Sequence, residues 1–150
     1  MMKWLKRKIY GINTLNELEI LVLGSIQNQL SSDAKDIWDK QISKINKVQR
    51  LPEGVESDFY SIDLKNGKAT FNVTLKFPNK TENLLLAIVT LKFENESIDI
   101  DVYCVKGRVF CLNFRGSSSY WIELFGMLDE YTNKIETKCT IKADLMEEIS

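Results

Sequence analysis

Apolar and polar residues alternate along residues 57–115, and this period of two predicts antiparallel strands joined by tight turns. Asn66-Gly67 favours a two-residue hairpin, because both positions of a type I′ turn require a positive φ. Residues 94–97 predict a second turn, and residues 105–107 predict a three-residue loop whose glycine forms a β-bulge. With these turns, the apolar side chains of successive strands fall on one face. The pattern therefore predicts a roughly five-stranded antiparallel meander.

The turns also predict which residues lie opposite each other. The second turn sets Lys92 opposite Asp99, which is a favourable cross-strand pair of charges. The third turn sets Val102 opposite Phe110, so that Phe110 lies on the apolar face. The other face of the sheet is left with mostly polar side chains.

Two helical patterns precede the sheet, at about residues 14–50. Thr14 and Glu17 have the spacing of a capping box at the start of the first helix. Ser32 or Asp33 can cap the second helix. Both segments carry the apolar stripe of helices that pack on a sheet. We therefore expect this helical pair to cover the apolar face.

Residues after the sheet predict a third helix at about 120–128 and a late strand or extended arm at about 137–143. This C-terminal segment either covers the polar face of the sheet or leaves it open. The fold class is therefore α+β, because a one-faced antiparallel sheet must bury that face against helices. The expected single domain, residues 1–150, has three parts: helices at about 14–50, an antiparallel sheet at about 57–115, and a helix with an extended segment at about 119–150.

Composition narrows the possible chemistry. The 150 residues are 44% hydrophobic and carry a formal net charge of -1, whereas a dedicated nucleic-acid binder is usually strongly basic. The chain has no histidine, which excludes Ser–His and Cys–His nucleophile systems and removes the commonest zinc ligand. We accordingly expect no catalytic residue, no cofactor and no metal site.

The spacing of the cysteines and the length of the apolar runs indicate in which cellular compartment the protein works. Cys104, Cys111 and Cys139 are an odd number without close spacing. The predicted register places Cys104 on the apolar face and Cys111 on the polar face, so a disulfide between them is not expected. No apolar run is long enough for a membrane helix. Reduced thiols favour a cytoplasmic protein.

Asp99 and Asp101 form the one carboxylate constellation in the sequence. Alternate residues of a strand share a face, so these two could hold a divalent cation or act as acid and base. Two acids on the solvated side of a strand are, however, an ordinary surface arrangement. A divalent-metal enzyme centred on this pair is therefore the least favoured function, and we expect a non-enzyme.

Three segments carry a family resemblance: a helix ending in Gln41…Asn46…Gln49-Arg50, a strand opening at Phe59-Tyr60, and the hairpin sequence 102–114. Over about half of the chain, these segments resemble small α+β proteins of bacterial polymorphic-toxin loci. Such proteins include the immunity proteins of contact-dependent growth inhibition systems. The resemblance implies a cytoplasmic protein that binds the C-terminal domain of a cognate toxin and covers its active site.

If that toxin cuts nucleic acid, its cleft is basic, and an acidic hairpin is suited to dock there with charge-steered association. The partner-binding residues predicted on this basis are Glu94, Glu96, Asp99, Asp101 and Tyr103. The alternative function is a general protein–protein adaptor or a secretion-associated chaperone. Neither function requires direct binding to nucleic acid, and the oligomeric state does not follow from the sequence.

Overall fold

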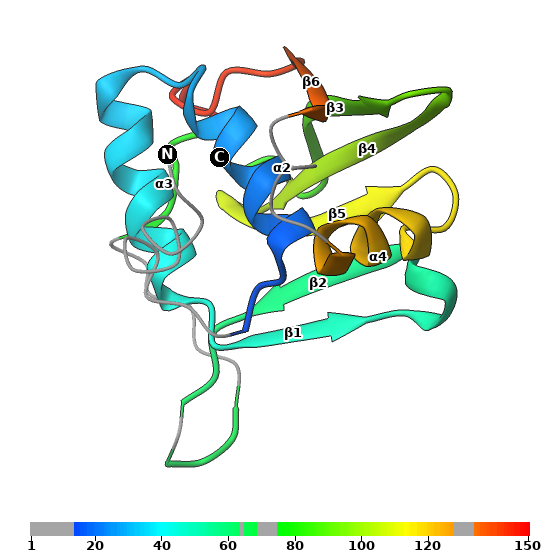
Figure 1. Cartoon of the computed structure of the whole chain (residues 1–150). Helices are drawn as coiled ribbons and strands as arrows, with labels where there is room; N and C mark the ends of the chain where they lie inside the picture. The colour runs from blue at the N-terminus through cyan, green and yellow to red at the C-terminus, as the bar shows by residue number, and fades with distance from the viewer. Residues whose placement is uncertain (1–13, 64, 69–74, 128–133) are drawn as a thin grey trace.

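The computed structural model of this chain describes residues 14–63, 65–68, 75–127 and 134–150 (Figure 1). The described helices and strands follow one another along the chain as α2 (Glu17–Gln27), α3 (Ser32–Lys44), β1 (Lys47–Arg50), the short 3₁₀ helix η1 (Pro52–Gly54), β2 (Glu56–Tyr60), β3 (Leu84–Phe93), β4 (Glu96–Val105), β5 (Arg108–Phe114), α4 (Ser119–Met127) and β6 (Glu136–Ile141). The α+β class predicted from the sequence is confirmed.

The strands of the described residues form one six-stranded sheet, all paired antiparallel, in the order β1-β2-β5-β4-β3-β6. The predicted late strand is confirmed as β6, which pairs with β3. The order differs from the predicted meander, because β2 pairs with β1 and β5. The predicted hairpin partner of β2, residues 69–74, lies outside the described residues. Strand β1 occupies residues for which the apolar stripe predicted the end of a helix.

The β3–β4 turn is two residues long, and Glu94 adopts a positive φ of 55° in it. Asp99 therefore lies opposite Thr90, and the predicted pairing with Lys92 is wrong. Lys92 lies opposite Ser97 instead. Between residues 87–93 and 96–102 the register differs from the predicted one by two residues, so these side chains still point to the predicted faces.

The β4–β5 turn is also two residues long, with positive φ at Lys106 and Gly107. The register shifts between Cys104 and Tyr103, so that Phe110 is the extra residue of a bulge inside the strand. The predicted bulge in the loop and the predicted pair of Val102 with Phe110 are therefore wrong. The ring of Phe110 is half-buried and makes an edge-to-face contact with another strand instead of joining the core.

Both helix starts lie close to the predicted positions but use other residues. Asn16 caps α2: its side chain accepts a hydrogen bond from the Glu19 backbone N–H (2.8 Å), and the Glu19 carboxylate accepts one from the Asn16 N–H (2.9 Å). This capping box lies two residues after the predicted one. Ser31 caps α3 through the Ala34 N–H. The predicted caps at Thr14, Ser32 and Asp33 are wrong.

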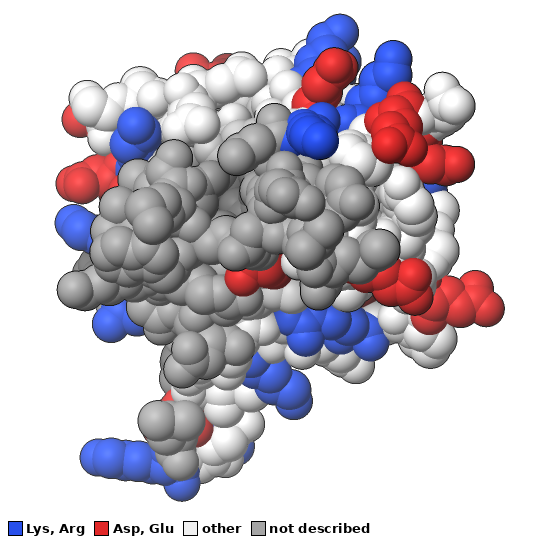
Figure 2. Space-filling model, viewed as in Figure 1, with Lys and Arg blue, Asp and Glu red and all other residues white. Residues whose placement is uncertain are grey.

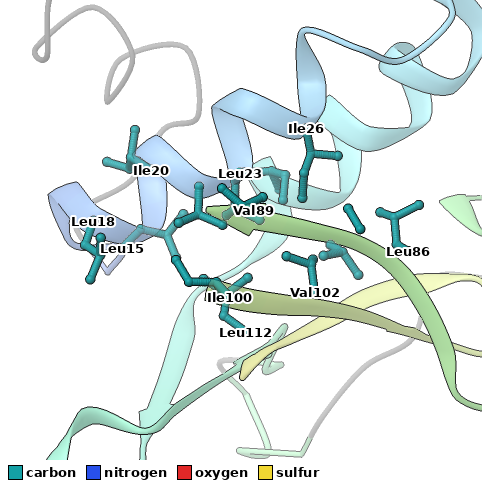
Figure 3. Close-up of a cluster of buried hydrophobic side chains, with 14 of the residues drawn as sticks. Leu15, Leu18, Ile20, Leu23, Ile26, Leu86, Val89, Ile100, Val102 and Leu112 are labelled. Atoms are coloured by element: carbon teal, nitrogen blue, oxygen red, sulfur yellow. The ribbon is translucent and has the colours of Figure 1, made fainter. Parts of the chain in front are cut away.

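The core lies between the helices and one face of the sheet. Figure 3 shows side chains of α2 packed against side chains of the central strands β3, β4 and β5, and Val89, Ile100, Val102 and Leu112 are fully buried there. Helix α4 joins the same core through Trp121. Figure 1 shows α2 and α4 in front of the sheet. The predicted third helix therefore packs on the helical side and does not cover the polar face. We call the polar face the open face because the buried apolar residues of the described helices lie on the other side of the sheet.

Candidate functional site

The five predicted contact residues do not form one surface. Glu94 and Glu96 are exposed at the end of the β3–β4 hairpin. Asp99, Asp101 and Tyr103 alternate along β4 on the open face, with Tyr103 farthest from the turn. The structure therefore separates an acidic hairpin end from a row of side chains on the sheet.

Arg115 binds both aspartates of that row. Its Nη2 and Nε lie 2.7 and 3.0 Å from the two carboxylate oxygens of Asp101, and its Nη1 lies 3.6 Å from Asp99 Oδ2. Thr90 Oγ1 also donates a hydrogen bond to Asp99 (2.6 Å). The side chain of Asp101 is only 11% exposed. Because a guanidinium already occupies this pair, the arrangement suits a cross-strand ion pair better than a cation site.

An exposed aromatic residue of α4 lies within electrostatic range of the acidic hairpin end. Tyr120 is 41% exposed and makes an edge-to-face contact with Trp121. Partial desolvation, together with the charges of Glu94 and Glu96, raises the pKa of Tyr120, so both carboxylates lie within electrostatic range of its hydroxyl. We call Glu94, Glu96 and Tyr120 the hairpin patch. Figure 2 shows acidic side chains along the side where Figure 1 places the β3–β4 turn and α4.

A second group of ionisable side chains lies on the open face between β2 and β5. Glu56, Asp58 and Tyr60 alternate on β2, and Cys111 of β5 is the direct cross-strand partner of Asp58. One ligand atom each from Glu56, Asp58 and Cys111 lie within 4.8 Å of one another. Asp58 and Cys111 are buried and Glu56 is half-buried. We call these three residues the carboxylate–thiol cluster.

The residues of the cluster shift one another's pKa values. A hydrogen bond to Asp58, burial and the Asp58 charge together raise the pKa of Glu56. Burial, followed by the interaction with Asp58, raises the pKa of the Cys111 thiol well above its ordinary value. Burial and the neighbouring carboxylates also raise the pKa of Tyr60. All three shifts have the direction expected for ionisable groups that are desolvated beside carboxylates.

The sequence did not point to this cluster. Glu56 and Asp58 show the same alternate spacing as Asp99 and Asp101, which was the available signal. The thiol joins them only because β2 lies beside β5, and that neighbour relation was not predicted.

A pocket of about 570 Å³ opens between the end of α3 and the ends of β2 and β5. Its lining is mainly apolar, with two cationic side chains, and consists of Gln41, Lys44, Ile45, Phe59, Tyr60, Ser61, Leu75, Val105, Arg108, Val109 and Phe110. No aspartate, glutamate or cysteine belongs to this lining among the described residues. The pocket therefore offers binding volume without a carboxylate or thiol from the described residues.

No family model, curated protein or solved structure matches this chain. None of the helices in the described part is long and apolar enough to cross a membrane.

Proposed function

We propose that this protein is a non-catalytic immunity protein, which binds a cognate bacterial toxin domain and blocks its active site. The observation that carries the proposal is the hairpin patch, where the exposed carboxylates of Glu94 and Glu96 lie within electrostatic range of exposed Tyr120. Neither carboxylate forms an ion pair within the described part of the chain. Their charge is therefore available to a partner.

The chemistry of the patch fits a partner with a basic cleft. Clefts that bind nucleic acid concentrate lysine and arginine to neutralise phosphate. Two exposed acids at the end of a hairpin would enter such a cleft and accelerate association through long-range attraction. Tyr120 adds an exposed aromatic side chain of the kind that anchors protein interfaces, within electrostatic range of those charges.

The patch also revises the contact residues predicted from the sequence. Asp101 is largely buried and bound by Arg115, so its charge is unavailable to a partner. Asp99 is partly exposed, but Thr90 and Arg115 already contact its carboxylate. We therefore place the centre of the interface at the turn and the start of α4, with Asp99 at its rim.

The test is calorimetric and kinetic titration with the C-terminal domain of the polypeptide encoded immediately upstream of this gene. We expect one-to-one binding that the double variant Glu94→Lys, Glu96→Lys weakens, chiefly by slowing association at low salt. The matched control is Glu147→Lys with Glu148→Lys, which reverses two exposed acids near the C-terminus. Equal toxin affinity of the two double variants would show that the interface does not lie at the hairpin patch.

A further inference from the structure

The carboxylate–thiol cluster has the donor atoms and the convergence of a metal site. One carboxylate oxygen each of Glu56 and Asp58 and the sulfur of Cys111 lie within 4.8 Å of one another. Tetrahedral ligands around Zn²⁺, at ordinary Zn–O and Zn–S lengths, are separated by roughly 3.3–3.8 Å. Side-chain movements on the order of 1 Å would therefore bring the three atoms to coordination distance.

Asp58 provides an independent reason to expect a ligand. Its side chain belongs to a residue that is 8% exposed, and its Oδ1 makes no hydrogen bond. Within the described part of the chain, no lysine or arginine forms an ion pair with Asp58 or Glu56. A buried carboxylate with no cationic partner among the described residues is costly, and buried charges are normally paired or bound to metal. The arrangement lacks a positively charged group at its centre.

The donor set selects among cations. Mg²⁺ and Ca²⁺ favour oxygen ligands and do not favour a thiolate. Zn²⁺ accepts cysteine sulfur together with aspartate and glutamate oxygens. We propose that Glu56, Asp58 and Cys111 bind a single zinc ion, with three protein ligands and the remaining coordination position open to water.

The strand geometry explains how this site arises in a chain without histidine. Two alternate carboxylates on β2 point to the same face, and the neighbouring strand presents a thiol directly opposite the second of them. Half-buried Glu56 lies at the accessible side of the cluster, where an ion would enter. The zinc site shares no residue with the hairpin patch, so it does not depend on the proposed function.

The experiment uses the full chain after treatment with a chelator, titrated with Zn²⁺ by calorimetry and with Co²⁺ by absorption spectroscopy. We expect one ion per chain and a thiolate-to-Co²⁺ charge-transfer band. Asp58→Asn and Cys111→Ser should each weaken binding by more than about 100-fold, beyond the roughly 10–100-fold that loss of an outer-shell partner costs. Cys139→Ser is the matched control, because it removes a thiol outside the cluster and should bind like the wild type.

A further variant separates loss of the metal site from misfolding of the protein. Glu56→Gln changes a half-buried residue without altering its volume, and we expect it to fold like the wild type by circular dichroism and to bind Co²⁺ more weakly. Absence of a thiolate band in the wild type would overturn the proposal. Zn²⁺ binding that persists equally in Asp58→Asn, Cys111→Ser and Glu56→Gln would also overturn it, because it would identify an adventitious ion only.

Discussion

The fully buried carboxylate of Glu19 accepts two hydrogen bonds from the guanidinium of Arg50, at 3.0 Å from Nε and 2.8 Å from Nη2. This pair joins the first turn of α2 to strand β1 at the edge of the sheet. The same carboxylate completes the capping box with Asn16, so one side chain supports both the helix end and the contact between the helix and the strand.

Arg50→Ala should therefore destabilise the fold strongly, since it leaves the Glu19 charge buried without its partner. Loss of one member of a buried pair typically costs about 3–5 kcal/mol, and exposure of the Arg50 side chain places the expected loss near the lower end. Urea unfolding measures this loss in the free energy of unfolding. Lys40→Ala breaks the exposed pair with Asp36 and should cost less than about 0.5 kcal/mol. Equal losses in the two variants would contradict a structural role for Glu19–Arg50.

Gln41 connects α3 to the β4–β5 turn. Its amide nitrogen donates to the Leu75 and Gly107 carbonyls, and its Oε1 accepts from the Val109 N–H at 3.0 Å. Gln41→Leu keeps the side-chain volume but leaves the Val109 N–H without an acceptor. We expect a loss of roughly 2–3 kcal/mol in urea unfolding, with faster hydrogen exchange at Val109.

The exposed residue Gln29, which donates one hydrogen bond to the Cys139 carbonyl, provides the comparison for this variant. Gln29→Leu should change stability by less than about 1 kcal/mol. If Val109 exchanges at the wild-type rate in Gln41→Leu, the amide of Gln41 does not hold the turn.

The aspartates of β4 should differ in their effect on stability. Asp101 is the more buried and is bound by Arg115 through two nitrogens, whereas Asp99 is partly exposed. We therefore expect Asp101→Ala to lower the melting temperature more than Asp99→Ala does. The reverse order would show that the Thr90–Asp99 hydrogen bond, and not the arginine, dominates this row.

Two features of the structure favour glycine at position 107. The backbone there has a φ of +85°, and a neighbouring backbone atom leaves no room for a Cβ. A Cβ at this position would lie 2.8 Å from the Phe77 carbonyl oxygen, which is backbone and cannot easily move. Gly67 also has a positive φ, but no described atom lies within 4 Å of its Cβ position. Gly67→Ala should cost about 1–2 kcal/mol from backbone strain alone, and Gly107→Ala should cost distinctly more. Thermal unfolding of both variants compares them, and equal costs would exclude the steric contribution.

The faces of the central strands were predictable because a face depends only on the alternation of side chains. Val89, Ile100 and Val102 are buried as expected, even though the turn lengths were wrong. Turn length depends on which residues adopt positive φ, and glutamate at position 94 carries no preference for it. The residues around Phe110 likewise give no sequence signal for a bulge. The bulge follows from the two-residue β4–β5 turn, because one extra residue in β5 is needed to change the register that this turn sets.

Long-range pairing limited the prediction of the sites. Residues 47–50 continue an apolar stripe of helical spacing, but in the structure they form a strand, from which Arg50 binds Glu19. The carboxylate–thiol cluster requires β2 to lie beside β5, and an Asn-Gly turn after β2 directed the prediction to a local hairpin instead. The hairpin patch combines the predicted acids with Tyr120, a residue of a helix whose docking position the sequence left open.

Inhibition of a toxin's own activity would test the proposed function without assuming which surface of this protein binds. The cognate toxin domain would be assayed for nucleic-acid cleavage while this protein is added in increasing amounts. The account predicts that activity disappears at one equivalent of the wild type, and that the Glu94→Lys, Glu96→Lys variant requires a large excess. Full toxin activity in the presence of excess wild-type protein would contradict the proposed function.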